Sequence, residues 1–139
     1  MPRILVAEDE PEMRRVLAWA LQREGYRVVE AANGNDLLAC VEPYLLGRSS
    51  RVDDVDFDLI ISDVRMPGVN GLKALEGIRA LRACEPRTPF IFITGFGDDW
   101  IRTEARRLEA FAVIEKPFTM EELLETVKRA LVDSLHHSI

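Results

Sequence analysis

The sequence has little of what several classes of protein require. It holds 2 cysteines among 139 residues, Cys40 and Cys84, which lie far apart and form no C-x-x-C spacing. Disulfide frameworks and zinc sites need more cysteines at closer spacing, so we read both as reduced residues that pack within the fold. No apolar run approaches the ~20 residues of a membrane-spanning helix, and the start of the chain, Met1-Pro2-Arg3, leads into an apolar run too short for a signal peptide. We therefore expect a cytoplasmic protein without membrane contact.

Positive charge is also in deficit. Lysine and arginine number 18 against 24 aspartates and glutamates, which gives a net charge of −6. This balance argues against direct contact with nucleic acid. Hydrophobic residues make up 47% of the chain and charged residues 30%, an ordinary balance for a globular protein. The length fits one domain with one core, which we place at residues 1–135, followed by a C-terminal tail at residues 136–139.

What the sequence does contain is a regular alternation of two patterns. Five short apolar runs have the length of buried strands, at residues 4–7, 27–31, 59–63, 90–93 and 112–114. Apolar residues at helical spacing follow each run, and the first such set is Met13, Val16, Leu17, Ala20 and Leu21. The last predicted helix begins with a capping box, Thr119 and Glu122. Repeated strand–helix units predict an α/β fold, a doubly wound five-stranded parallel sheet with helices on both faces.

Polar residues follow or end four of the five predicted strands. Glu8 and Asp9 follow the first, Asp63 ends the third, Thr94 follows the fourth, and Lys116 comes shortly after the fifth. The carboxyl ends of parallel strands lie at one edge of a sheet, and ligands bind in the crevice there. Taken singly, the acidic pair could cap the next helix, the threonine could stabilise a turn, and the lysine could be a solvated charge. Their meeting at one edge predicts a functional site.

The chemistry of this set points to phosphoryl transfer. Three carboxylates in one crevice repel one another unless a cation offsets their charge, and such oxygen ligands suit Mg²⁺ or Mn²⁺. A lysine and a threonine beside that metal can hold the anionic oxygens of a transferring phosphoryl group. Asp63 is then the candidate nucleophile, which would form an acyl phosphate.

In these residues the chain resembles the receiver domain of response regulators from two-component signal transduction systems. The motifs that carry the resemblance stand in the family's order: Glu8-Asp9, the stretch from Asp63 to Gly68, Ile93-Thr94-Gly95 and Lys116-Pro117-Phe118. The resemblance implies the flavodoxin-like (βα)5 fold with strand order 2-1-3-4-5. It also implies a signalling switch rather than an enzyme, one that assists only its own phosphorylation and dephosphorylation.

The resemblance gives a role to the acidic residues. Asp63 would accept a phosphoryl group from the histidine of a sensor histidine kinase or of a histidine phosphotransfer protein. Asp9 and Asp63 would bind Mg²⁺ together with the backbone carbonyl of Arg65, while Glu8 would act mostly through water.

It also implies how the switch works. Lys116 would contact the phosphoryl group, Thr94 would turn inward to hydrogen-bond it, and the Lys116-Pro117 bond would be cis. Phosphorylation would remodel the face made by residues 98–108, 112–114 and 119–135, where a downstream protein would bind. The resemblance also allows a phosphorylation-linked homodimer.

The chain departs from the family's pattern at two places. Many receivers carry Tyr or Phe three residues before the lysine, where this chain has Val113; Phe111 could take its place. From Gly47 to Asp56 the chain is polar and acidic without any period, which predicts an exposed loop longer than the family's usual one.

The sequence also bears on competing functions. Val113 leaves room for a receiver-like protein-binding module that works without phosphorylation, although the intact acidic pair and lysine argue against it. By the resemblance, the bulky side chains of Arg65 and Phe96 flank the phosphoryl group, which predicts a phosphorylated state that lasts minutes or longer.

A phosphohydrolase with an aspartate nucleophile would resemble a D-x-D pattern, in which the second carboxylate protonates the leaving group. This chain has Arg65 in place of that second carboxylate. A flavin or nucleotide binder is disfavoured because the first strand opens into Glu8-Asp9 rather than a glycine-rich phosphate cradle.

Overall fold

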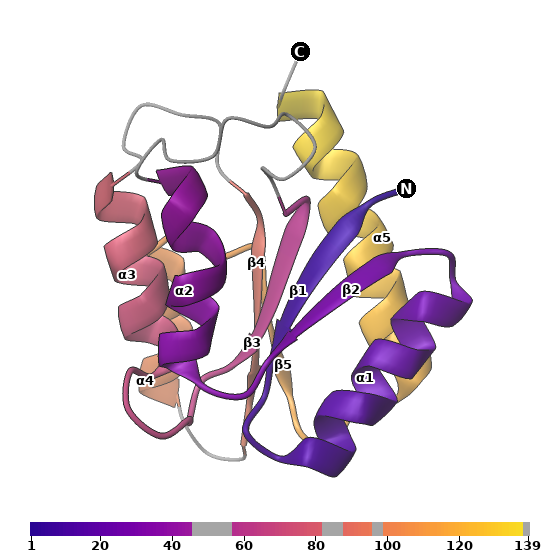
Figure 1. Ribbon diagram of the computed structural model, residues 1–139, viewed down its shortest axis with the longest axis horizontal. Coiled ribbons are helices and arrows are strands. Elements are labelled where there is room, and N and C mark those ends of the chain that lie inside the picture. Colours follow the sequence, from indigo (N-terminus) through magenta and orange to yellow (C-terminus); the bar gives the residue numbers. More distant parts are fainter. Residues whose placement is uncertain (46–56, 82–87, 96–98, 138–139) are drawn as a thin grey trace.

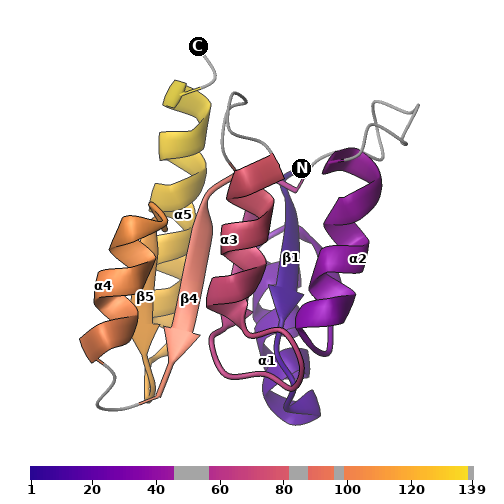
Figure 2. The same ribbon diagram turned by 90° about the vertical axis from the view of Figure 1, so that its left-hand side faces the viewer.

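The computed structural model describes residues 1–45, 57–81, 88–95 and 99–137. Its strands form one parallel sheet in the order β2-β1-β3-β4-β5, which confirms the expected order. The strands are β1 (Arg3–Ala7), β2 (Arg27–Ala31), β3 (Leu59–Asp63), β4 (Phe90–Thr94) and β5 (Ala112–Glu115). The helices are α1 (Pro11–Arg23), α2 (Gly34–Leu45), α3 (Gly71–Leu81), α4 (Asp99–Arg107) and α5 (Met120–His137). Helices α1 and α5 cover one face of the sheet, and α2, α3 and α4 cover the other (Figures 1 and 2).

The unbroken apolar runs are explained by cover on both faces. Every residue of β3 and β4 is buried. Successive side chains of a strand point to opposite faces. Ile60 therefore packs in the core layer under α2, α3 and α4, while Ile61 packs in the layer under α1 and α5. A central strand of this kind meets an apolar layer on each face, so apolar residues follow one another without alternation until the polar residues near its carboxyl end.

Helix α1 confirms most of the predicted buried stripe but not all of it. Leu17 and Leu21 are fully buried, and Ala18 and Ala20 are nearly so. The placement of Val16 in the stripe was wrong, because this side chain is 46% exposed. Each residue turns about 100° around a helix, so a stripe centred on Leu17 and Leu21 extends to Ala18 and leaves Val16 outside it.

Helix α5 begins as the capping box predicts and ends later than expected. The backbone N–H of Glu122 donates to Oγ1 of Thr119 at 3.0 Å. Leu123, Val127 and Ala130 are fully buried against the sheet. The helix continues to His137, two residues into the stretch expected to be a tail.

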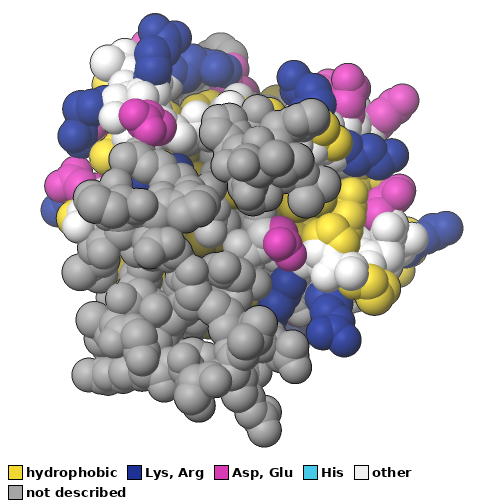
Figure 3. All heavy atoms as spheres, turned by 90° about the horizontal axis from the view of Figure 1, so that it is seen from above, with side chains coloured by type: hydrophobic (Ala, Val, Ile, Leu, Met, Phe, Trp, Pro, Cys, Tyr) yellow, Lys and Arg dark blue, Asp and Glu magenta, His cyan; other side chains and the backbone are white. Residues whose placement is uncertain are grey.

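Three of the features singled out in the sequence lie outside the described residues: Cys84, the stretch from Gly47 to Asp56, and Phe96. Cys40 is a free, half-buried cysteine packed against the core, as expected. Among the helices of the described part, none combines the length and the apolar character that crossing a membrane requires. Figure 3 shows the edge of the sheet where the strands begin, and the coloured basic and acidic side chains there are interspersed rather than gathered by sign.

Candidate functional site

The carboxyl ends of the strands meet at the lower edge of the sheet in Figures 1 and 2. Asp63 and Thr94 are the last residues of β3 and β4, and the acidic pair Glu8-Asp9 follows β1 directly. Lys116 follows β5 and starts the cis peptide bond to Pro117, as the resemblance implied. Because β1, β3, β4 and β5 are consecutive neighbours in the sheet, the predicted site residues lie at one edge.

Asp63 and Lys116 form the ion pair at the centre of this edge. Nζ of Lys116 donates to Oδ2 of Asp63 at 2.8 Å, and the backbone N–H of Arg65 donates to Oδ1 at 3.0 Å. Asp63 is 5% exposed. Partial burial disfavours the charged Lys116, but the hydrogen bond and charge of Asp63 outweigh it, so the pKa of Lys116 is raised above its usual value. Lys116 is therefore held as a cation against Asp63, which is the candidate nucleophile.

Glu8, Asp9 and Asp63 form an acidic cluster in which one carboxylate oxygen of each lies within 4.8 Å of the others. Burial first, and then the neighbouring Asp63, raise the pKa of Glu8 to about 8, while Lys116 lowers it in part. Ionising all three carboxyl groups therefore needs more positive charge than Lys116 supplies. A divalent cation would supply the remaining positive charge, and carboxylate oxygens at this spacing suit Mg²⁺.

Two buried polar atoms at this edge have no hydrogen-bond partner. They are Oε2 of Glu8 and Oγ1 of Thr94, and no other buried side-chain oxygen or nitrogen in the described part of the chain lacks one. Both residues are 1% exposed. An unpaired buried polar group costs folding free energy, of order 1–3 kcal/mol. The position of both atoms at the acidic cluster fits a site that binds a cation and an anionic group.

The loop after β3 is held by two close backbone approaches. A Cβ on Gly71 would lie 2.6 Å from the carbonyl oxygen of Asp63. A Cβ on Gly34, the first residue of α2, would overlap the carbonyl oxygen of Val69. Both positions therefore need glycine, and the loop that carries Arg65 is fixed against α2 at one end and against Asp63 at the other.

The comparisons with known proteins agree with this geometry. The sequence matches the family model of the response regulator receiver domain over residues 4–128. This chain belongs to that family. It is 30% identical over 132 residues to the response regulator receiver protein CpdR of Brucella abortus, covering 95% of this chain and 98% of CpdR. It is 36% identical over 129 residues to the regulatory protein AtoC of Escherichia coli, and there it spans 93% of itself but 25% of AtoC.

A solved structure of the same family has the same fold. It is the response regulator receiver domain protein of Methanospirillum hungatei JF-1, with a TM-score of 0.83, 27% identity and 98% coverage of each chain. Receiver domains are signalling switches of two-component systems, the family generally binds Mg²⁺ at an acidic pocket, and this chain has an acidic cluster of Glu8, Asp9 and Asp63.

The structure corrects one expectation about this receiver. Val113 is half-buried in the core layer under α2, α3 and α4, but Phe111 packs in the opposite layer, under α1 and α5. Phe111 precedes the first residue of β5, so the alternation of the strand does not extend to it. The suggestion that Phe111 replaces the missing aromatic residue was therefore wrong.

One residue at the site was missed in the sequence. Arg14, in α1, donates a hydrogen bond to the backbone carbonyl of Glu8. A cation near the first turn of a helix is unfavourable with respect to the helix dipole, and that signal could have drawn attention to it.

Proposed function

We propose that this receiver domain accepts a phosphoryl group on Asp63. The observation that carries the proposal is the Asp63–Lys116 pair, joined at 2.8 Å beside two further carboxylates. The donor would be the phosphohistidine of a sensor histidine kinase or of a histidine phosphotransfer protein. An oxygen of Asp63 would attack phosphorus, a P–O bond would form, and the P–N bond to the histidine would break, leaving the imidazole as the leaving group.

Different residues of the chain would have different roles in this transfer. Lys116 would move its hydrogen bonds from Asp63 to the oxygens of the incoming phosphoryl group, where negative charge accumulates. Glu8, Asp9 and Asp63, with the backbone carbonyl of Arg65, would hold Mg²⁺. When bound, the ion supplies positive charge that offsets the repulsion between the acidic cluster and the phosphoryl oxygens.

The switch would then be read out through Thr94. Its hydroxyl is buried at the end of β4 without a partner, so a phosphoryl oxygen on Asp63 would offer it one. A movement of Thr94 would be passed to α4 and β5, which are joined by the ion pair between Arg102 and Glu115 at 3.0 Å. Val113 fills the place of the usual aromatic residue with a smaller side chain, so the change on this face would be confined to backbone and helix position. A downstream protein, or a second copy of the chain, would bind there.

The experiment that tests the proposal is the intact mass of the protein after incubation with Mg²⁺ and acetyl phosphate, compared with Asp63→Asn. We expect one hydroxylamine-labile phosphoryl adduct on the wild-type protein and none on the variant. Its decay after removal of the donor should take minutes or longer. An unmodified wild-type protein that binds Mg²⁺ would overturn the proposal in favour of a phosphorylation-independent binding module. The cytoplasmic location expected from the sequence forms part of the same proposal.

A further inference from the structure

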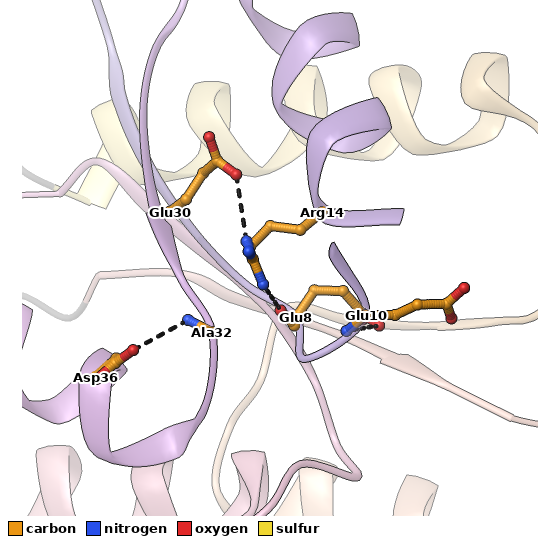
Figure 4. Close-up of polar contacts among 6 residues, drawn as sticks. All are labelled: Glu8, Glu10, Arg14, Glu30, Ala32 and Asp36. Atoms are coloured by element: carbon orange, nitrogen blue, oxygen red, sulfur yellow. Dashed lines mark hydrogen bonds and ion pairs between the residues drawn. The ribbon is translucent and has the colours of Figure 1, made fainter. Parts of the chain in front are cut away.

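The side chain of Arg14 reaches back from α1 to the end of β1. Its Nη1 donates to the carbonyl oxygen of Glu8 at 2.8 Å, and its Nε donates to Oε1 of Glu30 at 3.3 Å. Figure 4 shows the guanidinium between these two partners. The Arg14 side chain is 19% exposed, against 42% for Glu30, so the bond to Glu8 is partly buried while the pair with Glu30 lies at the surface.

The carbonyl that Arg14 binds belongs to the peptide bond between Glu8 and Asp9. A peptide bond is planar, so the position of its oxygen also determines the direction in which the chain continues into Asp9. The other backbone group of Glu8 is held from the opposite side, because its N–H donates to the carbonyl of Ala31 at 3.0 Å. The backbone N–H of Glu10 donates to Oε1 of Glu8 at 3.3 Å, as Figure 4 also shows. Arg14 supplies the one side-chain contact to this peptide oxygen within the described residues.

Asp9 depends on its backbone for its position. It is exposed and lies between the end of β1 and the start of α1. Its carboxylate makes no hydrogen bond or ion pair with another described residue, although its oxygen lies within 4.8 Å of ligand atoms of Glu8 and Asp63. The contact that orients the preceding peptide therefore contributes to where the Asp9 carboxylate stands relative to Asp63.

The hydrogen bonds of Arg14 indicate that it positions the backbone and does not simply compensate the charge of the acidic cluster. Arg14 directs one donor to a neutral carbonyl and the other to Glu30, and neither to the carboxylates of the acidic cluster. Glu30 compensates the charge of the guanidinium and orients its N–H donors. An arginine can bind both partners at once because its donors diverge from a rigid plane, which a lysine cannot reproduce.

We propose that Arg14 is a positioning residue of the metal site, which holds the Glu8–Asp9 peptide so that Asp9 faces Asp63. This rests on the proposed function, in which these acids bind Mg²⁺. Contacts that orient metal ligands typically change metal affinity by about 10- to 100-fold when they are removed.

The test is the Mg²⁺ dissociation constant by isothermal titration calorimetry for the wild-type protein, Arg14→Met, Arg14→Lys and Arg15→Met. Arg15 is the matched control, because it is the exposed next residue of α1 and its removal changes the net charge equally. We expect Arg14→Met to bind Mg²⁺ about 10-fold more weakly, Arg15→Met to stay within about 2-fold, and Arg14→Lys to recover part of the loss. Hydrogen exchange of the Asp9 and Glu10 amides in the metal-free protein should accelerate in Arg14→Met alone.

Each other outcome overturns the inference. If Arg14→Met and Arg15→Met bind Mg²⁺ with equal affinity, Arg14 affects the metal site only through the net charge of the protein or does not affect it. If Arg14→Lys restores the full Mg²⁺ affinity, a positive charge at this position is enough and the shape of the guanidinium is not needed. Should Arg14→Met be too unstable to titrate, Glu30→Gln provides the milder variant. An unchanged Mg²⁺ affinity in Glu30→Gln would contradict the role of the Arg14 guanidinium as oriented by Glu30. A wild-type protein that binds no Mg²⁺ would refute the proposed function itself, whereas failure of the Arg14 comparison alone would leave that function standing.

Discussion

The middle of the sheet and its carboxyl edge are built from opposite kinds of residue. In the middle, Ile61 and Ile91 are fully buried among apolar side chains. At the edge, two or three positions further along the same strands, the buried residues are Asp63 and Thr94. The middle lowers the free energy of the fold through apolar burial, whereas the edge holds polar groups that cost free energy until a ligand satisfies them. Substitutions should therefore separate stability from ligand binding according to which region they touch.

The largest effect on stability is expected in the middle of β4. Ile91→Ala removes a fully buried side chain that pairs in register with Ile61, and we expect it to lower the free energy of unfolding by about 2–5 kcal/mol. Urea denaturation followed by circular dichroism measures this. At low temperature, where the variant is folded, its Mg²⁺ affinity should match that of the wild-type protein. A large loss of affinity in the folded variant would break the separation of the two regions.

A glycine pair gives the second comparison. Gly34→Ala places a Cβ where it overlaps the carbonyl oxygen of Val69, so the loop after β3 must move, and we expect loss of both stability and Mg²⁺ affinity. Gly77→Ala is the matched control, since its Cβ meets nothing within 4 Å in α3. That variant should gain about 0.5–1 kcal/mol from helix propensity without a change in metal binding. Urea denaturation measures the stability of the two variants, and titration calorimetry measures their Mg²⁺ affinity. Equal stability and equal affinity in Gly34→Ala and Gly77→Ala would contradict the close approach of Gly34 to Val69.

The edge should also make the stability of the metal-free protein depend on pH. The pKa of Glu8 is raised to about 8 in the folded protein from a usual value of 4.5, so the folded state binds the proton more tightly than the unfolded state does. The resulting stabilisation is fully present below the usual pKa and is lost as pH rises through about 8. Denaturation midpoints in EDTA at pH 6 and pH 9, for the wild-type protein and Glu8→Gln, measure this contribution. The decline toward pH 9 should be smaller in Glu8→Gln, and an equal decline would assign it to other groups.

The smallest effect is expected on the exposed surface beside the carboxyl edge, where Glu115 lies in register with Thr94. The Arg102–Glu115 pair is formed by side chains that are 48% and 41% exposed. Exposed pairs contribute about 0–1 kcal/mol, so Arg102→Ala should change the free energy of unfolding by less than about 1 kcal/mol. A thermal melt measures the shift. A larger loss would show that the contact between α4 and β5 is part of the core rather than of the exposed face.

The sequence predicted the strands and the site because both depend on local patterns. Each central strand is an unbroken apolar run, and the polar residue after it stands at the carboxyl edge in any parallel sheet of this kind. Asp63, Thr94 and Lys116 were found this way. The limits of the buried stripe in α1 could not be read as reliably, since Val16 lies within helical spacing of the stripe and still faces solvent.

Contacts between distant backbone and side-chain atoms were not predictable from such patterns. The bond from Arg14 to the Glu8 carbonyl uses an acceptor that every residue has, so no residue type marks it. The approach of Gly34 to Val69 joins residues far apart in sequence, and it depends on how α2 packs beside the loop after β3. The opposite packing of Phe111 and Val113 depends on where β5 begins, and strand limits are the least certain part of a sequence-based assignment.

If the carboxyl edge is organised to bind a cation, the thermal midpoint of unfolding should depend on the Mg²⁺ concentration. A ligand that binds only the folded state raises stability by RT ln(1 + [L]/Kd). We predict that the midpoint of the wild-type protein rises with Mg²⁺, while that of Asp63→Asn rises much less because one of the three carboxylates of the cluster is gone. Equal rises in both proteins, or no rise in the wild-type protein, would contradict the account.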